Sequence, residues 1–207
     1  MSSANEYYTI ESLATTQLIV KGSRFITHAA PASEKESAET FIAGISETFH
    51  DATHNCFAYK IGVDDAAIFR FSDAGEPSGT AGRPILQAIE TKKLTNVAVV
   101  VTRYFGGTKL GTGGLVRAYN SSALAALNQA AISVYYPQIR LRLSFRFQFT
   151  NAVHQLLNKF QGQVVESHFS EQSEYVVQLK TVEAEPFTSE LRDATSGRVA
   201  IERTVGS

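Results

Sequence analysis

Strict alternation of apolar and polar residues marks segment 138–149. Every second position there is apolar: Ile139, Leu141, Leu143, Phe145, Phe147 and Phe149. A period of two over this length predicts a β-strand with one buried face. Arg140, Arg142 and Arg146 fall between these positions and are expected on the opposite face. That face is either a solvated surface with carboxylate partners or a basic stripe suited to phosphate.

Helical and strand periods alternate through the rest of the C-terminal third. A helix that starts at Thr150 or Asn151 carries an apolar stripe at Val153, Leu156, Leu157 and Phe160, and Gly162 is placed to end it. Strands are predicted at 163–169 and 174–181, a second helix at 184–194 and a short strand at 199–201. This βαββαβ order predicts a ferredoxin-like domain over residues 138–207.

The pattern before Pro137 predicts a separate α+β domain over residues 1–137. Ser33 and Glu36 have the spacing of a capping box, and a helical apolar stripe follows at Ala38, Phe41, Ile42, Ile45 and Phe49. Strands are predicted at 17–30, 55–61 and 66–71, and a short one at 132–136. Residues 97–101 are continuously apolar, which is typical of a strand covered on both faces. A helix is expected over 112–130.

Two glycine-rich stretches in the first domain are candidates for binding chemistry. The first, SDAGEPSGTAGRP at 72–84, holds too much glycine and proline for the interior of a helix or central strand. The second, RYFGGTKLGTGGLVRAY at 103–119, follows the buried strand and opens a helix. Backbone N–H groups and the positive helix end would favour an anion there, with Arg103, Lys109 and Arg117 adding charge. Alternatively, the glycines serve only tight turns and close packing.

Known nucleotide motifs do not fit either stretch. Neither holds the Gly-Lys pair of a Walker A loop, and position 116, where a dinucleotide fingerprint needs its third glycine, is Val116. We therefore expect no nucleotide cofactor and no other cofactor. The predicted binding residues are Ser72, Asp73, Gly75, Glu76, Ser78, Gly79, Thr80, Gly82 and Arg83 in the first stretch, and Arg103, Tyr104, Gly106, Gly107, Lys109, Gly111, Thr112, Gly113, Gly114 and Arg117 in the second.

Composition narrows the class of protein further. The chain has 207 residues, 19 Lys and Arg, 20 Asp and Glu, and a net charge of −1, which disfavours a protein that binds polyanions over its whole surface. The single cysteine, Cys56, excludes an intrachain disulfide and fits a reducing compartment. No apolar run approaches the ~18 residues of a membrane span, and the first residues lack a secretory signature. We expect a cytoplasmic protein with no membrane partner.

Other candidate sites are weaker. His50 and His54 have the i, i+4 spacing of metal ligands, but the predicted helix ends between them, so we expect no metal site. Cys56 lies in an apolar context that predicts burial rather than nucleophilic reactivity. Asp73 and Glu76 are either an acid–base pair or carboxylates that hold their own turn.

The two glycine-rich stretches, with residues 21–26 and 51–56, resemble the IMPACT family, specifically its bacterial YigZ-like branch. One departure is Ala74, where many relatives carry a second aspartate. The resemblance implies an N-terminal α+β domain similar to domain IV of elongation factor G and a C-terminal ferredoxin-like domain similar to its domain V. The eukaryotic relatives look like translational regulators that act through protein contacts, so the resemblance implies a link to translation.

These observations leave three hypotheses about function. The leading one is a non-enzymatic, translation-associated protein that contacts RNA, the ribosome or a protein partner through the glycine-rich face, with no catalytic residue. The first alternative is an enzyme acting on a small anionic phosphate or carboxylate metabolite with Asp73 and Glu76. The second is a pure protein–protein adaptor with an exposed apolar patch. The sequence does not fix the oligomeric state.

Overall fold

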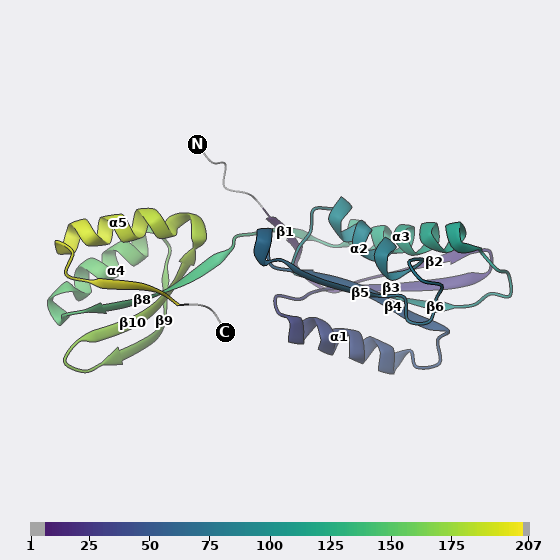
Figure 1. Ribbon diagram of the computed structural model, residues 1–207, viewed down its shortest axis with the longest axis horizontal. Coiled ribbons are helices and arrows are strands. Elements are labelled where there is room, and N and C mark those ends of the chain that lie inside the picture. The colour runs from purple at the N-terminus through teal and green to yellow at the C-terminus, as the bar shows by residue number, and fades with distance from the viewer. Residues whose placement is uncertain (1–6, 205–207) are drawn as a thin grey trace. The chain divides into compact units, whose positions relative to one another are not determined.

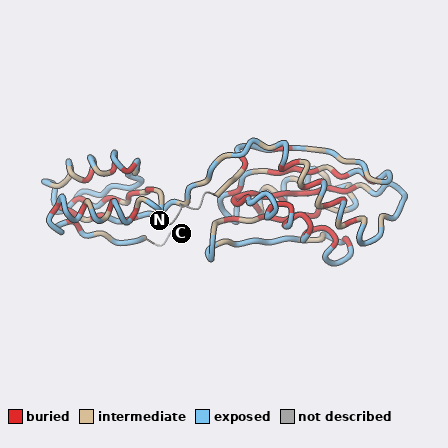
Figure 2. The backbone as a smooth tube through the Cα atoms, turned by 90° about the horizontal axis from the view of Figure 1, so that it is seen from above, coloured by how far each residue is buried: buried red, intermediate tan, exposed pale blue. Residues whose placement is uncertain are grey.

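The computed structural model describes residues 7–204 of the chain. These residues divide into two compact units, one ending at Tyr135 and the other beginning at Tyr136. We refer to them as the N-terminal and C-terminal domains. Each has its own buried apolar core, as the red positions of Figure 2 show.

A five-stranded antiparallel sheet forms the centre of the N-terminal domain (Figure 1). In sheet order its strands are β2 (Ala14–Val20), β3 (Ser23–Pro31), β6 (Val97–Tyr104), β4 (His54–Ile61) and β5 (Ile68–Ser72). A separate two-stranded sheet pairs β1 (Tyr7–Ile10) with β7 (Ile132–Tyr135), and a short 3₁₀ turn, η1 (Asp64–Ala66), precedes β5.

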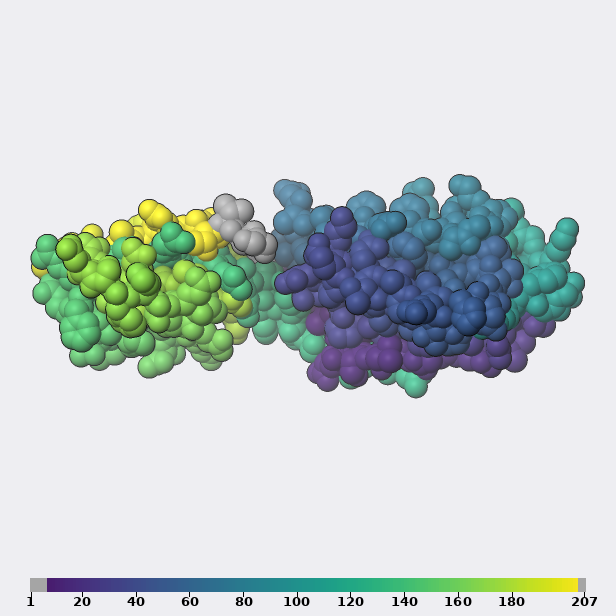
Figure 3. Space-filling view, turned by 90° about the horizontal axis from the view of Figure 1, so that it is seen from below, coloured from purple at the N-terminus to yellow at the C-terminus, as the bar shows by residue number. Residues whose placement is uncertain are grey.

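Helices cover both faces of the five-stranded sheet. Helix α1 (Lys35–Thr48) lies on one face, which Figure 3 shows, and α2 (Gly82–Thr91) and α3 (Thr112–Gln129) lie on the other (Figure 1). Alternate residues of β6 enter the two cores: Val99 packs on the α2 and α3 side and Val100 on the α1 side. The prediction that 97–101 is a strand covered on both faces is confirmed.

Local details of the N-terminal domain correct three predictions. The segment 17–30 is not one strand: Lys21 and Gly22 take positive φ values of 47° and 81°, and this two-residue turn makes β2 and β3 a hairpin. The capping box of α1 uses Glu34 and Ser37, one residue later than expected. Helix α2 and strand β1 were not predicted. Helix α2 starts inside the stretch 72–84, whose glycine and proline content argued against a helix interior.

The C-terminal domain is a four-stranded antiparallel sheet with two helices on one face. In sheet order the strands are β11 (Ala200–Thr204), β8 (Gln138–Phe145), β10 (Ser173–Lys180) and β9 (Gln163–Phe169). The helices are α4 (Thr150–Lys159) and α5 (Ala184–Thr195). Strand β10 lies between β8 and β9, which is the split βαβ arrangement. The predicted ferredoxin-like fold, and with it the two-domain α+β class, is confirmed.

The long alternating segment 138–149 is shorter as a strand than its pattern indicates. β8 ends at Phe145, and a 3₁₀ turn, η2 (Phe147–Phe149), leads into α4. Phe147 is 79% exposed, and the hydroxyl of Thr150 donates to its carbonyl oxygen at 2.7 Å. The alternation continues by coincidence through a turn that the chain needs before α4. A second 3₁₀ turn, η3 (Thr181–Glu183), precedes α5.

Candidate functional site

Both glycine-rich stretches lie at the same end of the five-stranded sheet. The register pairs Tyr104, at the end of β6, with Arg24 at the start of β3, and Arg103 with His54 at the start of β4. Ser72, at the end of β5, pairs with Phe57 of β4. The loops 21–22, 49–53, 73–81 and 105–111 therefore gather there with the first turn of α3. We call this region the glycine-rich end.

The first stretch is folded around the carboxylate of Asp73. Its Oδ2 accepts the N–H of Gly79 at 2.8 Å, and its Oδ1 accepts those of Ala81 at 2.9 Å and Gly82 at 2.8 Å. Burial acts to raise the pKa of Asp73, but the three N–H donors outweigh it and hold that pKa below its usual value. These backbone donors are therefore satisfied within the protein.

Glu76 ties the first stretch to the second through a buried ion pair. Its Oε1 accepts Nη1 of Arg103 at 2.6 Å and the hydroxyl of Tyr119 at 2.7 Å. Glu76 is 8% exposed and Arg103 is 5% exposed. Nη2 of Arg103 also donates to Ser23 Oγ at 3.3 Å. Arg103 is thus a structural cation, not one that a ligand in solvent can reach.

Two further polar residues of the first stretch, Ser72 and Thr80, also hold its shape. The Thr80 hydroxyl donates to the Pro77 carbonyl at 2.7 Å, and Ser72 Oγ accepts the N–H of Ala74 at 3.2 Å. A Cβ on Gly82 would lie 2.7 Å from the Ser72 backbone, so this glycine permits close packing. Gly75, Ser78 and Gly79 are exposed. Arg83 is exposed on α2, beside a separate groove.

Cys56 and the histidines form no reactive or metal-binding cluster in the described structure. Burial raises the pKa of the fully buried Cys56 thiol to about 12, and its Sγ donates to the Asp73 carbonyl at 2.9 Å. His54 Nδ1 lies 2.8 Å from the Ala74 carbonyl oxygen, and its Nε2 lies 3.9 Å from Glu76 Oε2. Within residues 7–204 no group of three His, Cys, Asp or Glu side chains is placed to hold a metal ion.

The second stretch presents a different surface. Gly111 takes a φ of 72° and precedes α3, whose first-turn N–H groups at Thr112, Gly113 and Gly114 have no acceptor among residues 7–204. Gly107, Gly111, Thr112 and Gly113 are exposed. The N–H of Gly106 is occupied, because it donates to Ser23 Oγ at 3.2 Å. A helix N-terminus with open N–H groups attracts anions.

Exposed cations lie at the glycine-rich end. Lys109 and Arg117 come from the second stretch, whereas Lys21 of the β2–β3 turn and Arg24 at the start of β3 were not predicted. Among the described residues, these four side chains take part in no ion pair. Lys21 and Arg117 line a shallow pocket of about 280 Å³ whose other walls include Val20 and Leu110. Lys21 and Arg24 lie about 80 residues from the second stretch, so only the tertiary fold reveals their proximity.

Two neighbouring aromatic residues, Tyr104 and Phe105, lie at this end. The guanidinium of Arg24 covers the Tyr104 ring at 4.5 Å from its centroid, and the Tyr104 hydroxyl donates to Asp51 Oδ1 at 2.7 Å. That hydrogen bond raises the pKa of Tyr104. Phe105, next in sequence, is 48% exposed. Phe105 can offer an open edge to a base or an apolar group, while Tyr104 positions Arg24.

Comparisons with known proteins agree with this architecture. The Impact N-terminal domain family matches residues 21–127, and a domain of unknown function, DUF1949, matches residues 147–198. The IMPACT family member YvyE of Bacillus subtilis is 35% identical over 205 residues, which cover 96% of this chain and 91% of that protein. The IMPACT family member YigZ of Escherichia coli is 33% identical over 183 residues, covering 88% and 90%.

A solved structure supports the same assignment. A crystal structure of a hypothetical protein superimposes with a TM-score of 0.76 at 30% identity and covers 98% of both chains. Fold and matches together define a two-domain α+β protein with an Impact-type N-terminal domain, consistent with the predicted likeness to domains IV and V of elongation factor G. The chain belongs to the IMPACT family, as its two glycine-rich stretches predict.

In residues 7–204, no helix combines the length and the apolar character that crossing a bilayer requires.

Proposed function

We propose that this chain is a non-enzymatic, cytoplasmic, translation-associated binding protein that contacts single-stranded RNA, free or on the ribosome, through its glycine-rich end. One observation carries the proposal: Lys21, Arg24, Lys109 and Arg117 are exposed at the glycine-rich end, which also holds the open N–H groups of α3, and they have no ion-pair partner among residues 7–204. Phosphates of a nucleic acid backbone are the polymeric anions that such a surface fits.

The enzyme alternative gains no support from the carboxylates on which it depends. Asp73 accepts three backbone N–H groups, and Glu76 is bound to Arg103 and Tyr119 inside the protein. Neither carboxylate is free to exchange a proton with a bound substrate without breaking the fold of its own stretch. The glycine-rich end is therefore better suited to binding than to acid–base chemistry.

Titration of single-stranded RNA at several salt concentrations tests the proposal. Four phosphate contacts give a log–log slope of affinity against salt of about −3, taking roughly −0.7 per contact on a single strand. Raising salt from about 50 to 200 mM then weakens binding on the order of fifty-fold. Absence of saturable binding by the wild type at low salt would refute the RNA proposal.

Three variants locate the site. Lys109→Ala flattens the slope by about 0.7, the share of one contact. Gly113→Asp weakens binding more, because it puts a carboxylate beside the α3 N–H groups. Arg140→Ala, on the exposed face of the C-terminal sheet, is the matched control and leaves the slope unchanged. Loss of binding in Arg140→Ala alone would place the site in the C-terminal domain instead.

A further inference from the structure

Strand β5 is an edge strand with exposed aromatic side chains. It pairs with β4 on one side, and no strand among residues 7–204 pairs with its other side. Phe69 is 59% exposed and Phe71 is 40% exposed. Soluble proteins normally protect an edge strand with charged residues, proline or a covering segment, because an unprotected edge pairs with strands of other chains. An open edge flanked by two aromatic residues is a surface suited to strand addition.

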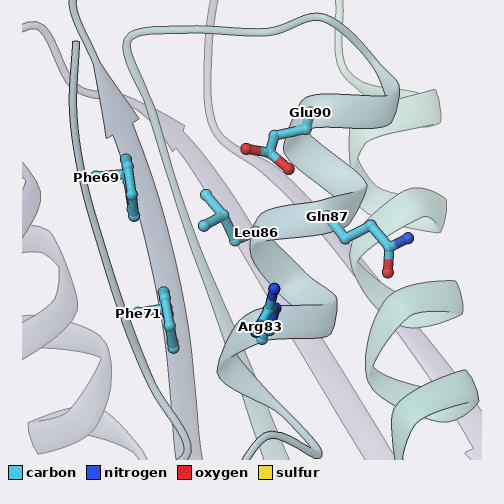
Figure 4. Close-up of a pocket in the computed structure, with 6 residues that line it drawn as sticks. All are labelled: Phe69, Phe71, Arg83, Leu86, Gln87 and Glu90. Atoms are coloured by element: carbon cyan, nitrogen blue, oxygen red, sulfur yellow. The ribbon is translucent and has the colours of Figure 1, made fainter.

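A groove of about 520 Å³ runs between β5 and the outer side of α2 (Figure 4). The α2 residues that line it are Arg83, Leu86, Gln87 and Glu90, which are spaced i, i+3, i+4 and i+7 and so form one helical stripe. Arg83 lies opposite Phe71 and Glu90 opposite Phe69 (Figure 4). Neither Arg83 nor Glu90 takes part in an ion pair among residues 7–204. The groove is therefore open and apolar, with the cation Arg83 at one end and the anion Glu90 at the other.

We propose that a second copy of this chain covers this groove, with β5 of the two copies paired antiparallel about a twofold axis at Arg70. The sequence around the axis is symmetric, Phe-Arg-Phe at 69–71. An antiparallel register centred on Arg70 therefore sets Phe69 of one copy directly opposite Phe71 of the other. Aromatic residues in directly opposed cross-strand positions stabilise a strand pair. The two five-stranded sheets become one continuous sheet across the axis.

The same twofold axis pairs the free charges. Because Arg83 lies level with Phe71 and Glu90 level with Phe69, the axis brings Arg83 of each copy to the level of Glu90 of the other. The two α2 helices run antiparallel on one face of the joined sheet. A surface that complements itself in this way is the property that an isologous dimer requires. A different partner would need its own matching pair of charges, whereas a second copy already carries it.

Arg70 itself does not prevent this pairing. It points to the opposite face of the sheet, where its Nη1 donates to Glu39 Oε1 of α1 at 2.6 Å. Like charges directly opposed across strands are unfavourable. Here each guanidinium is already bound to a carboxylate of its own chain, which offsets the repulsion at the axis.

Sedimentation of the full chain tests the dimer. The wild type should sediment as a dimer at about 100 µM. Even a weak specific interface, with a dissociation constant of about 10 µM, is mostly dimeric at that concentration. Phe69→Ser removes both symmetry-related aromatic pairs through a change at an exposed position, and it raises the dissociation constant about 10-fold or more. Lys109→Ala, at the glycine-rich end, is the control that leaves dimerisation unchanged. A monomeric wild type at that concentration would overturn the proposal and leave the groove to a different chain.

Charge reversal distinguishes this twofold arrangement from any other association. Arg83→Glu and Glu90→Arg each set like charges against one another across the axis and should each weaken the dimer about 10- to 100-fold. Two combinations restore opposite charges: the double variant Arg83→Glu/Glu90→Arg in one chain, and an equimolar mixture of the two single variants. Both should dimerise as the wild type does. A dimer that persists in Arg83→Glu, or a mixture that stays monomeric, contradicts the antiparallel placement of α2.

Discussion

The two glycine-rich stretches have similar composition and use their backbone in opposite ways. The first, 72–84, directs its N–H groups inward at Asp73 and its Glu76 into the domain interior. The second, 103–119, leaves the first turn of α3 open to solvent among exposed cations. The stretches lie at the same end of one sheet, so their location does not explain the difference.

The different use of backbone N–H groups in the two stretches follows from their carboxylates. Residues 72–84 contain both Asp73 and Glu76, whereas residues 103–119 contain no Asp or Glu at all. A glycine-rich loop that carries its own carboxylate has an internal acceptor for its N–H groups. A loop without one must offer them to water or to an external anion. Damage to the first stretch should therefore lower stability, and damage to the second should lower binding.

The largest expected effect comes from Arg103→Met. This change leaves Glu76 as an unpaired buried carboxylate and should reduce the free energy of unfolding by about 3–5 kcal/mol. Arg117→Met, an exposed cation of the same stretch, should change it by no more than about 0.5 kcal/mol. Urea unfolding followed by circular dichroism measures both. Equal losses would mean that the ion pair contributes little and that the contrast between buried and exposed cations fails.

Gly106→Ala should have the next largest effect, about 2–3 kcal/mol of destabilisation. A Cβ at this position would lie 1.9 Å from the Gly22 carbonyl carbon, so the loop 105–111 and the β2–β3 turn would have to separate. Gly44→Ala is the control: it has no atom within 4 Å of the new Cβ and lies inside α1. That change should raise stability by about 0.5–1 kcal/mol. Tolerance of Gly106→Ala would show that the close contact with Gly22 can relax.

Asp73→Asn should destabilise the domain by about 1–2 kcal/mol near neutral pH. The amide oxygen can still accept the N–H groups of Ala81 and Gly82 in weaker neutral bonds, but the amide nitrogen is a donor and cannot accept the N–H of Gly79. The folded-state pKa of Asp73 lies below its unfolded value, so its stabilisation is complete above about pH 4 and is lost as pH falls through the folded pKa. The difference between wild type and variant should therefore shrink in acid. Unfolding free energies measured over a pH series check this.

Asp65→Asn serves as the matched control, since Asp65 is an exposed aspartate in η1. It should show no comparable loss near neutral pH. A constant difference between Asp73→Asn and wild type across the acid range would contradict the role assigned to the Asp73 charge.

Much of the fold could be predicted because periodicity records burial directly. The ferredoxin-like domain follows from alternation and helical stripes, and β6 from its continuous apolar run. The sequence-based predictions failed mainly at turns. The hairpin at Lys21 and Gly22 falls in the polar run 21–24, which the prediction of one strand over 17–30 overlooked. Phe147 continues an alternation that the backbone has already left. Helix α2 begins at Gly82 and carries Pro84 in its first turn, where proline is tolerated although it breaks a helix interior.

The candidate site was predicted less completely. The sequence locates both glycine-rich stretches, but not that Arg103 pairs with Glu76, which lies 27 positions away. Nor does it place Lys21 and Arg24 at the glycine-rich end, since that requires the register of β2, β3 and β6. The carboxylates of the first stretch were a usable signal. A glycine-rich loop with its own carboxylate acceptors is expected to bond its backbone N–H groups within the protein.

The smallest expected effect, and the one that separates the two stretches most finely, comes from Gly113→Ala. A Cβ there meets only Arg117 Nη1 at 3.5 Å, an ordinary contact, and alanine favours a helix over glycine. Stability should rise by about 0.5 kcal/mol. RNA affinity should fall about threefold, because the methyl group hinders approach to the open N–H groups of α3. A structural glycine would give the opposite result, lower stability with binding changed only through unfolding. Urea unfolding and RNA titration of the same preparation measure the change in stability and the change in RNA affinity together. If stability rises while affinity stays at the wild-type value, the N–H groups of α3 take no part in binding and the four cations alone account for it.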